Sequence, residues 1–353
     1  MKTLQFIDPK KLSKECKITF IIGNGFDLGL GMKTKYTDVY DGYIKSPSSS
    51  DVIARFKKEL ESKAANNYEK WSDFEMGMAY YAQTLKTEDE LVECIRDFKG
   101  YMVDYLRCEN QEIIGLIRDD DYASRLIKEL DRSIEHFYEG LTQNVINQLK
   151  AMIKDANIIR NYITFNYTMS LEAFLAIKAK YQHVVEATPI HIHGKLDEDV
   201  VLGIDNTEQL SEIAFSLTRK GRRAFIKTIF NEQYDKARVD AAKRIISESD
   251  IICIYGFSLG ESDKTWIELL SNWLLEDTNH HLVVYQYDTK EYRRYNYDEI
   301  MDIEDEKKVA LLTKLRVNND AILNQIHIPI GCDIFNFSFQ KVIPHRLPVG
   351  VYE

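Results

Sequence analysis

The sequence contains no run of about 18 consecutive apolar residues, the length that a membrane-spanning helix requires. Its first residues, MKTLQFIDPKKLSKECK, also lack the apolar stretch of a signal peptide, so we expect a cytoplasmic protein with no membrane partner. The five cysteines are widely spaced and form no CxxC pair, which is typical of reduced thiols. They provide no metal framework, and we expect no bound metal.

The sequence also lacks an excess of basic residues. Its net charge is −10 at pH 7 and its pI is about 5.4. Nucleic-acid binding depends on clustered Lys and Arg, so a nucleic-acid partner is not expected. A local basic pocket for a small anionic ligand remains compatible with this charge.

Proline is absent over a long part of the chain. None of the six prolines falls between Ser48 and Thr188, and proline breaks helix interiors. Apolar residues within this stretch recur at helical spacing. They predict helices over 52–60, 71–81 and 91–106, and one long helix over 126–152.

Strand signals lie on both sides of this helical block. The segment KITFII (17–22) precedes a glycine turn, and further apolar segments follow the block. Near-continuous apolar strands that alternate with helices predict an α/β fold with a doubly wound, mainly parallel, Rossmann-like sheet. The further candidate strands are 158–165, 191–193, 200–202, 251–255 and 282–287, and the candidate helices between them are 171–181, 225–246 and 264–275.

This pattern predicts one sheet domain that is interrupted after its first strand and helix. We assign residues 15–37 plus 156–297 to a nucleotide-binding domain and residues 38–155 to a helical insertion. Residues 298–353 are expected to be an extension packed on the sheet domain, with a short helix over 305–315 and strands near 326–335.

The first candidate site is the glycine-rich turn that follows strand 17–22. Its spacing, GxGxxxG, differs from the GxGxxG dinucleotide fingerprint. Glycine lets a backbone approach a phosphate, and amides at a helix start favour an anion. Asp27 is expected to hold a ribose hydroxyl or to order the loop, and the alternative is a tight turn without a ligand. The candidate binding residues here are Gly23, Asn24, Gly25, Phe26 and Asp27.

Two further motifs also follow candidate strands. Thr164 to Thr168 (TFNYT) places Asn166 where it can fix a water and a ribose hydroxyl, or where it or Thr168 merely caps the next helix. His191-Ile192-His193-Gly194-Lys195 offers a general base, and strand alternation predicts that both histidines face the same side. The alternative for these histidines is a buried structural role.

The fourth motif, YGFSLGESD (255–263), follows the strand IICIY. Gly256, Ser258 and the loop amides can bind phosphate or ribose, whereas Asp263 is either a polar contact or a helix cap. In a parallel sheet all four motifs would open at the carboxyl edge, where ligands of such sheets bind.

In this order, IIGNGFDLGLGMKTKY, WSDFE (71–75), TFNYT, HIHGK and YGFSLGESD resemble the AbiH family of bacteriophage abortive infection proteins. The resemblance covers most of the chain from about residue 18 to residue 263. It implies an antiviral defence function.

A looser similarity to sirtuin-like NAD-binding domains implies that NAD is the substrate or ligand. It places Asn166 and His193 at the catalytic positions, and we expect Thr164 and Gly194 to be among the residues that bind the cofactor. Thr168 stands where the sirtuin motif has Asp, and the zinc-binding cysteines are absent, so protein deacylation is not expected. The implied activity is hydrolysis of NAD to nicotinamide and ADP-ribose.

Two other functions remain open from the sequence. The same crevice can sense NAD, ADP-ribose or another nucleotide without turnover. A nucleic-acid-directed toxin would use the basic run 219–223 (RKGRR), which is otherwise a solvated helix start or a contact for ligand phosphates. Because a constitutive NAD hydrolase would poison its host, we expect control by a homo-oligomer, a regulatory partner, a phage-derived trigger or a lid that includes Glu75.

Overall fold

The computed structural model describes residues 14–66, 74–117, 120–182, 186–210, 213–286, 296–332, 334, 335 and 337. Residues 71–73 of the WSDFE motif, residue 287 and most of the chain after residue 332 lie outside this part. None of the helices that it describes combines the length and apolar character needed to cross a lipid bilayer.

Six strands of the described chain form one sheet in the order β3-β2-β1-β4-β5-β6, and every neighbouring pair is parallel. This is the strand order of dinucleotide-binding sheets, and it confirms the predicted α/β, Rossmann-like class. The chain crosses from β3 to β4 on the other side of β1, so a switch point lies at the carboxyl ends of the neighbouring strands β1 and β4. The strands are β1 (Glu15–Ile22), β2 (Asn157–Thr164), β3 (Ile190–His191), β4 (Ile251–Tyr255), β5 (His281–Tyr285) and β6 (Ile326–His327).

The described chain between β1 and β2 is helical, as the absence of proline predicts. The helices of this region are α1 (Gly25–Gly29), α2 (Tyr36–Lys45), α3 (Asp51–Asn66), α4 (Phe74–Ala82), α5 (Glu88–Ile117), α6 (Asp120–Glu135) and α7 (Gln143–Ile153). The helices after β2 are α8 (Ser170–Gln182), α9 (Arg219–Phe225), α10 (Lys227–Tyr234), α11 (Lys236–Ser247), α12 (Lys264–Glu276) and α13 (Tyr297–Leu315).

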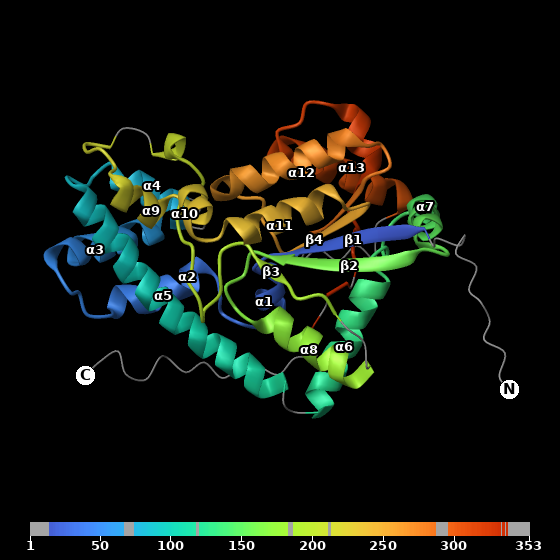
Figure 1. Ribbon diagram of the computed structural model, residues 1–353, viewed down its shortest axis with the longest axis horizontal. Helices are drawn as coiled ribbons and strands as arrows, with labels where there is room; N and C mark the ends of the chain where they lie inside the picture. Colours follow the sequence, from blue (N-terminus) through green and yellow to red (C-terminus); the bar gives the residue numbers. More distant parts are fainter. Residues whose placement is uncertain are drawn as a thin grey trace.

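Helices cover both faces of the sheet (Figure 1). Phe20 and Ile22 of β1 point to the core shared with α6 and α8, whereas Ile21 points to the core shared with α11, α12 and α13. The alternation follows from the period-2 geometry of a strand. A third core is formed by the helices α2, α3, α4 and α5 together with residues of the 196–226 segment. We call this part of the molecule, at the left of Figure 1, the helical lobe.

Three predicted elements are wrong in detail. The helix expected over 126–152 is two helices, α6 and α7, because the chain turns at Gly140 with φ +81°. The helix expected over 225–246 is divided between α9, α10 and α11, since Ile226 and Asp235 have non-helical backbone angles. The strand expected over 200–202 does not form, because Val200 and Leu202 pack into the helical core instead of the sheet.

Candidate functional site

The first and fourth motifs pack directly against each other at the switch point of the sheet. The Gly23 amide donates to the Tyr255 carbonyl at 2.9 Å, and the Gly25 amide donates to the Gly256 carbonyl at 2.9 Å. A Cβ atom on Gly23 would lie 2.5 Å from the Phe257 Cα, and one on Gly256 would lie 2.5 Å from the Gly25 Cα. The close approach of two backbones therefore accounts for these glycines without a ligand.

The remaining predicted residues of the first loop have structural partners. The Asn24 amide donates to the Thr34 carbonyl at 2.9 Å and accepts from the Thr34 hydroxyl at 2.5 Å. Phe26 is fully buried and packs edge-on against Phe174. These contacts show how the loop is held, and the binding roles of Asn24 and Phe26 remain predictions.

Asp27 joins the first motif to the second. Its carboxylate accepts from the Thr168 hydroxyl at 2.6 Å and from the Ser170 hydroxyl at 2.5 Å. Burial raises the pKa of Asp27 to about 6, although both hydroxyls oppose this shift. Asn166 also approaches the carboxylate, but neither of its amide atoms makes a well-aligned hydrogen bond within the described chain. These contacts tie the first loop to the start of α8, and the ribose contact expected of Asp27 remains a prediction.

The second and third motifs meet through His191. The backbone N–H of Asn166 donates to the Thr164 hydroxyl at 3.1 Å, and Nδ1 of His191 lies 2.8 Å from the backbone carbonyl oxygen of Asn166. The other ring nitrogen of His191 contacts Glu172. Both nitrogens of this imidazole thus have partners, which agrees with the structural alternative for His191.

His193 belongs to a different group. Strand β3 ends at His191, so the predicted alternation does not extend to His193, and the two imidazoles contact different residues. Nε2 of His193 lies 3.0 Å from Oδ1 of Asp263, and this contact joins the third motif to the fourth. The backbone turns after it at Gly194, where φ is +77°. The rings of Phe165 and Tyr167 flank the imidazole at 5.3 and 6.0 Å between centroids.

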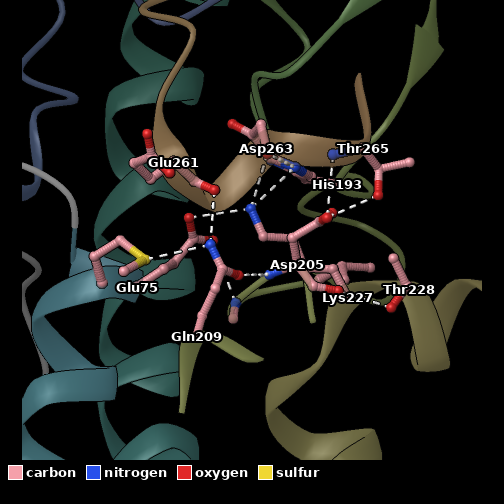
Figure 2. A network of polar contacts seen from close by, with 12 residues as sticks. Glu75, His193, Asp205, Gln209, Lys227, Thr228, Glu261, Asp263 and Thr265 are labelled. Carbon is pink, nitrogen blue, oxygen red and sulfur yellow. Dashed lines mark hydrogen bonds and ion pairs between the residues drawn. The ribbon is translucent and has the colours of Figure 1, made fainter. Parts of the chain in front are cut away.

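Lys227 is the centre of this buried group, which Figure 2 shows. Its ammonium donates to Asp263 at 2.9 Å and to Glu75 at 3.1 Å, and lies 3.4 Å from Nε2 of His193. Glu75 comes from α4 and also accepts from the Gly203 amide. We call Glu75, His193, Lys227 and Asp263 the histidine network.

The charges of the histidine network determine its protonation. Burial disfavours the charge on Lys227, but Asp263 and Glu75 hold its pKa above the usual value. Burial would raise the pKa of Asp263, yet Lys227 and His193 together hold it well below its usual range. Burial and the Lys227 charge lower the pKa of His193, against the opposing effect of Asp263. At neutral pH Lys227 is therefore an ammonium, Asp263 a carboxylate and His193 a neutral imidazole.

Asp205 lies beside the histidine network and helps to hold its surroundings. Its carboxylate accepts from the Thr265 amide at 3.1 Å and from the Thr265 hydroxyl at 2.7 Å, which fixes the start of α12. Its backbone nitrogen donates to Gln209, whose side-chain amide reaches the Glu261 carbonyl (Figure 2). Burial raises the pKa of Asp205.

The four motifs thus touch in a ring: the first against the fourth, the first against the second, the second against the third, and the third against the fourth. Ser258 departs from this arrangement, because it is exposed and its carbonyl accepts from Lys314. Lys227 is not among the residues that the sequence predicts for the site, although it follows the basic run 219–223 by four positions. Its partners Glu75 and Asp263 lie 152 and 36 positions away, so no local spacing identifies the group.

The arrangement is chemically suited to base catalysis. With Nε2–H directed at Asp263, Nδ1 of a neutral His193 carries the free electron pair of a general base. Within the described chain, no group of three or more His, Cys, Asp or Glu side chains is arranged to hold a metal ion.

A comparison with protein-family models matches residues 19–285 to the family described as bacteriophage abortive infection AbiH. No curated protein matches the chain.

Proposed function

Because the chain belongs to the AbiH family of bacteriophage abortive infection proteins, we propose that it is an abortive-infection effector that hydrolyses NAD to nicotinamide and ADP-ribose. The observation that carries the proposal is the neutral, carboxylate-bound His193 at the carboxyl edge of a sheet with dinucleotide-binding strand order. Ligands of such sheets bind at this edge, and an imidazole kept neutral can accept a proton near pH 7.

The proposed step is attack of a water molecule on C1′ of the nicotinamide ribose. The water oxygen forms a bond to C1′, and the C1′–N bond breaks through an oxocarbenium-like transition state. Its electron pair returns to the pyridinium ring, which leaves as neutral nicotinamide. Nδ1 of His193 accepts the proton of the water, and Asp263 stabilises the imidazolium. Asn166 would orient the water and a ribose hydroxyl, a task for which its two unaligned amide atoms are available.

A non-catalytic sensor is the second candidate. His193 is only 6% exposed, and the glycine turns that would surround a pyrophosphate are packed against each other. Such a closed arrangement suits a protein that binds a nucleotide and changes shape without turnover. The two candidates differ in whether NAD is consumed during phage infection.

Control of the effector is part of the proposal. A hydrolase that is active without a signal would deplete the NAD of its own cell, so a homo-oligomer, a regulatory partner or a phage-derived trigger would release the activity. The test must therefore be made in bacteria, both before and during phage infection.

We expect NAD to fall and ADP-ribose and nicotinamide to rise in infected cells that express the protein, as measured by mass spectrometry of nucleotide extracts. His193→Gln removes the base and should slow the loss of NAD by roughly 100-fold or more. His136→Gln is the matched control, because His136 is exposed and lies outside the histidine network. Unchanged NAD during protection from phage would exclude the hydrolase and favour the sensor.

A further inference from the structure

A cavity of about 350 Å³ lies between α5, residues 199–202 and the two helices α9 and α10. This volume is within the range of small-molecule sites, which begins at about 300 Å³. The cavity lies next to the histidine network, because Lys227 contributes to its wall. None of the four motifs identified in the sequence is centred on it.

The walls of the cavity are strongly cationic in an otherwise acidic chain. Arg96 and Lys99 project from α5, and Lys220 and Arg223 come from α9, whereas Asp199 is the single acidic residue of the lining. Lys220 is paired with Asp89 at 2.6 Å. Within the part of the chain that the structure describes, neither Arg96 nor Lys99 forms an ion pair.

Two cations of the cavity wall, Arg223 and Lys99, are partly buried without an ion pair to a carboxylate of the described chain. Among the described residues, Arg223 donates only to the hydroxyl of Tyr234, a neutral partner, at 3.0 Å. Lys99 is partly buried, and burial lowers its pKa while Asp199 raises it. Partly buried cations without carboxylate partners are stabilised when an anion binds between them, since charge-assisted hydrogen bonds are strongest where water is excluded.

One side of the cavity is aromatic. The rings of Phe230 and Tyr234, one turn apart on α10, stack with centroids 4.9 Å apart and an interplanar angle of 30°. Tyr234 is 57% exposed, so its outer ring face is available for a planar group. Cations and an exposed aromatic face together match the two chemical parts of a nucleotide, its phosphates and its base.

We propose that this cavity binds the nucleotide, with phosphates on Arg96, Lys99 and Arg223 and with the base on Tyr234. The inference rests on the proposed function for the identity of the nucleotide, which would then be NAD. It assigns the phosphates to cations of α5 and α9 instead of the glycine turn. Lys227 would carry the effect of ligand binding to His193, because it lines the cavity and its ammonium lies 3.4 Å from Nε2 of the imidazole.

The test is direct binding to the purified full chain by titration calorimetry, with ADP and inorganic pyrophosphate as probes. Lys99→Gln combined with Arg223→Gln should weaken both probes by about 100-fold, because each substitution removes a charge-assisted contact. Arg219→Gln combined with Arg222→Gln is the matched control. It removes the same charge from exposed residues outside the cavity lining and should change either affinity by less than about threefold.

A second pair of variants tests the aromatic wall. Tyr234→Ala should weaken ADP by roughly tenfold and leave pyrophosphate within about twofold, since only ADP has a base to stack. Tyr234→Phe keeps the ring and removes only the hydroxyl that accepts from Arg223. This variant should retain the parent preference for ADP.

The outcomes separate the inference from the proposed function. Failure of both probes to bind, or equal affinity in the cavity and control variants, overturns the cavity assignment even if NAD is hydrolysed in cells. Cavity-dependent binding of ADP without any loss of NAD supports the cavity and excludes the hydrolase. A single-stranded oligonucleotide that binds more tightly than ADP, with steep salt dependence, would overturn the nucleotide assignment in favour of a nucleic acid.

Discussion

At the scale of single residues, the buried carboxylates of this protein divide into two kinds. Asp263 lies beside an ammonium, which keeps it ionised, whereas Asp27 accepts from the neutral hydroxyl groups of Thr168 and Ser170. Neutral hydroxyls do not compensate a buried charge fully, and the pKa of Asp27 rises to about 6. Asp27 therefore makes stability depend on pH.

The direction of that dependence follows from the raised pKa. The folded protein holds the Asp27 proton more tightly than the unfolded chain, so its contribution to stability is present below about pH 4 and is lost as the pH rises through about 6. Asp27→Asn should remove up to about 3 kcal/mol of this pH dependence. Urea unfolding of the parent and the variant at about pH 4 and about pH 7, one at each end of the transition, measures it. An equal change in the free energy of unfolding between the two pH values in both proteins would contradict this role of Asp27.

At the scale of elements, the turn after β1 and the turn after β4 act as one unit. Gly23 and Gly25 of the first turn donate backbone hydrogen bonds to Tyr255 and Gly256, and the two backbones touch at Gly25 and Gly256 without intervening side chains. The short helix α1 is consequently held against the sheet by its neighbouring turn. Any side chain at this contact must separate the two turns.

Gly25→Ala should therefore destabilise the protein by about 2 kcal/mol, because the new Cβ would press on the Gly256 backbone. Gly100→Ala is the matched control on α5, where an added Cβ meets open space. There alanine should stabilise the helix by up to about 1 kcal/mol. Urea midpoints of both variants test the pair, and a neutral Gly25→Ala would show that the turns are not in close contact in solution.

At the scale of the whole molecule, the histidine network fastens the helical lobe to the sheet. Glu75 belongs to α4 in the lobe, Lys227 begins α10, and Asp263 precedes α12 on the sheet. The single ammonium compensates both carboxylates. Two parts of the chain with separate hydrophobic cores are thereby joined through one buried side chain.

Lys227→Met should destabilise the fold by about 3–5 kcal/mol, since it leaves two buried carboxylates without their cation. Hydrogen exchange should show faster opening of α4 and of the 261–265 segment than of β1. Lys236→Met, at the exposed start of α11, is the control and should be close to neutral. Retention of parent stability by Lys227→Met would show that the network does not connect the lobe to the sheet.

Local sequence patterns by themselves determined the strands β1, β2, β4 and β5, the helical region between β1 and β2, and the positions of the four motifs at strand ends. Apolar periodicity and glycine placement depend on residues that are close in the sequence, so they predict strands, helices and turns without knowledge of the tertiary structure. The same patterns did not reveal the helix break at Gly140, although a glycine followed by Thr142 is an ordinary stop and start signal. The apolar stripe continues across that break because both helices pack on one core.

Only the tertiary structure decided which polar groups meet. The pairing of Lys227 with Glu75 spans 152 positions, and the cationic cavity combines α5 with α9, which lie more than 100 positions apart. Such contacts depend on how the helical lobe packs against the sheet, which no local spacing encodes. Burial then determines the protonation of these groups. A lysine or a carboxylate has its ordinary pKa in water, and the pKa shifts when neighbouring protein groups replace the solvent.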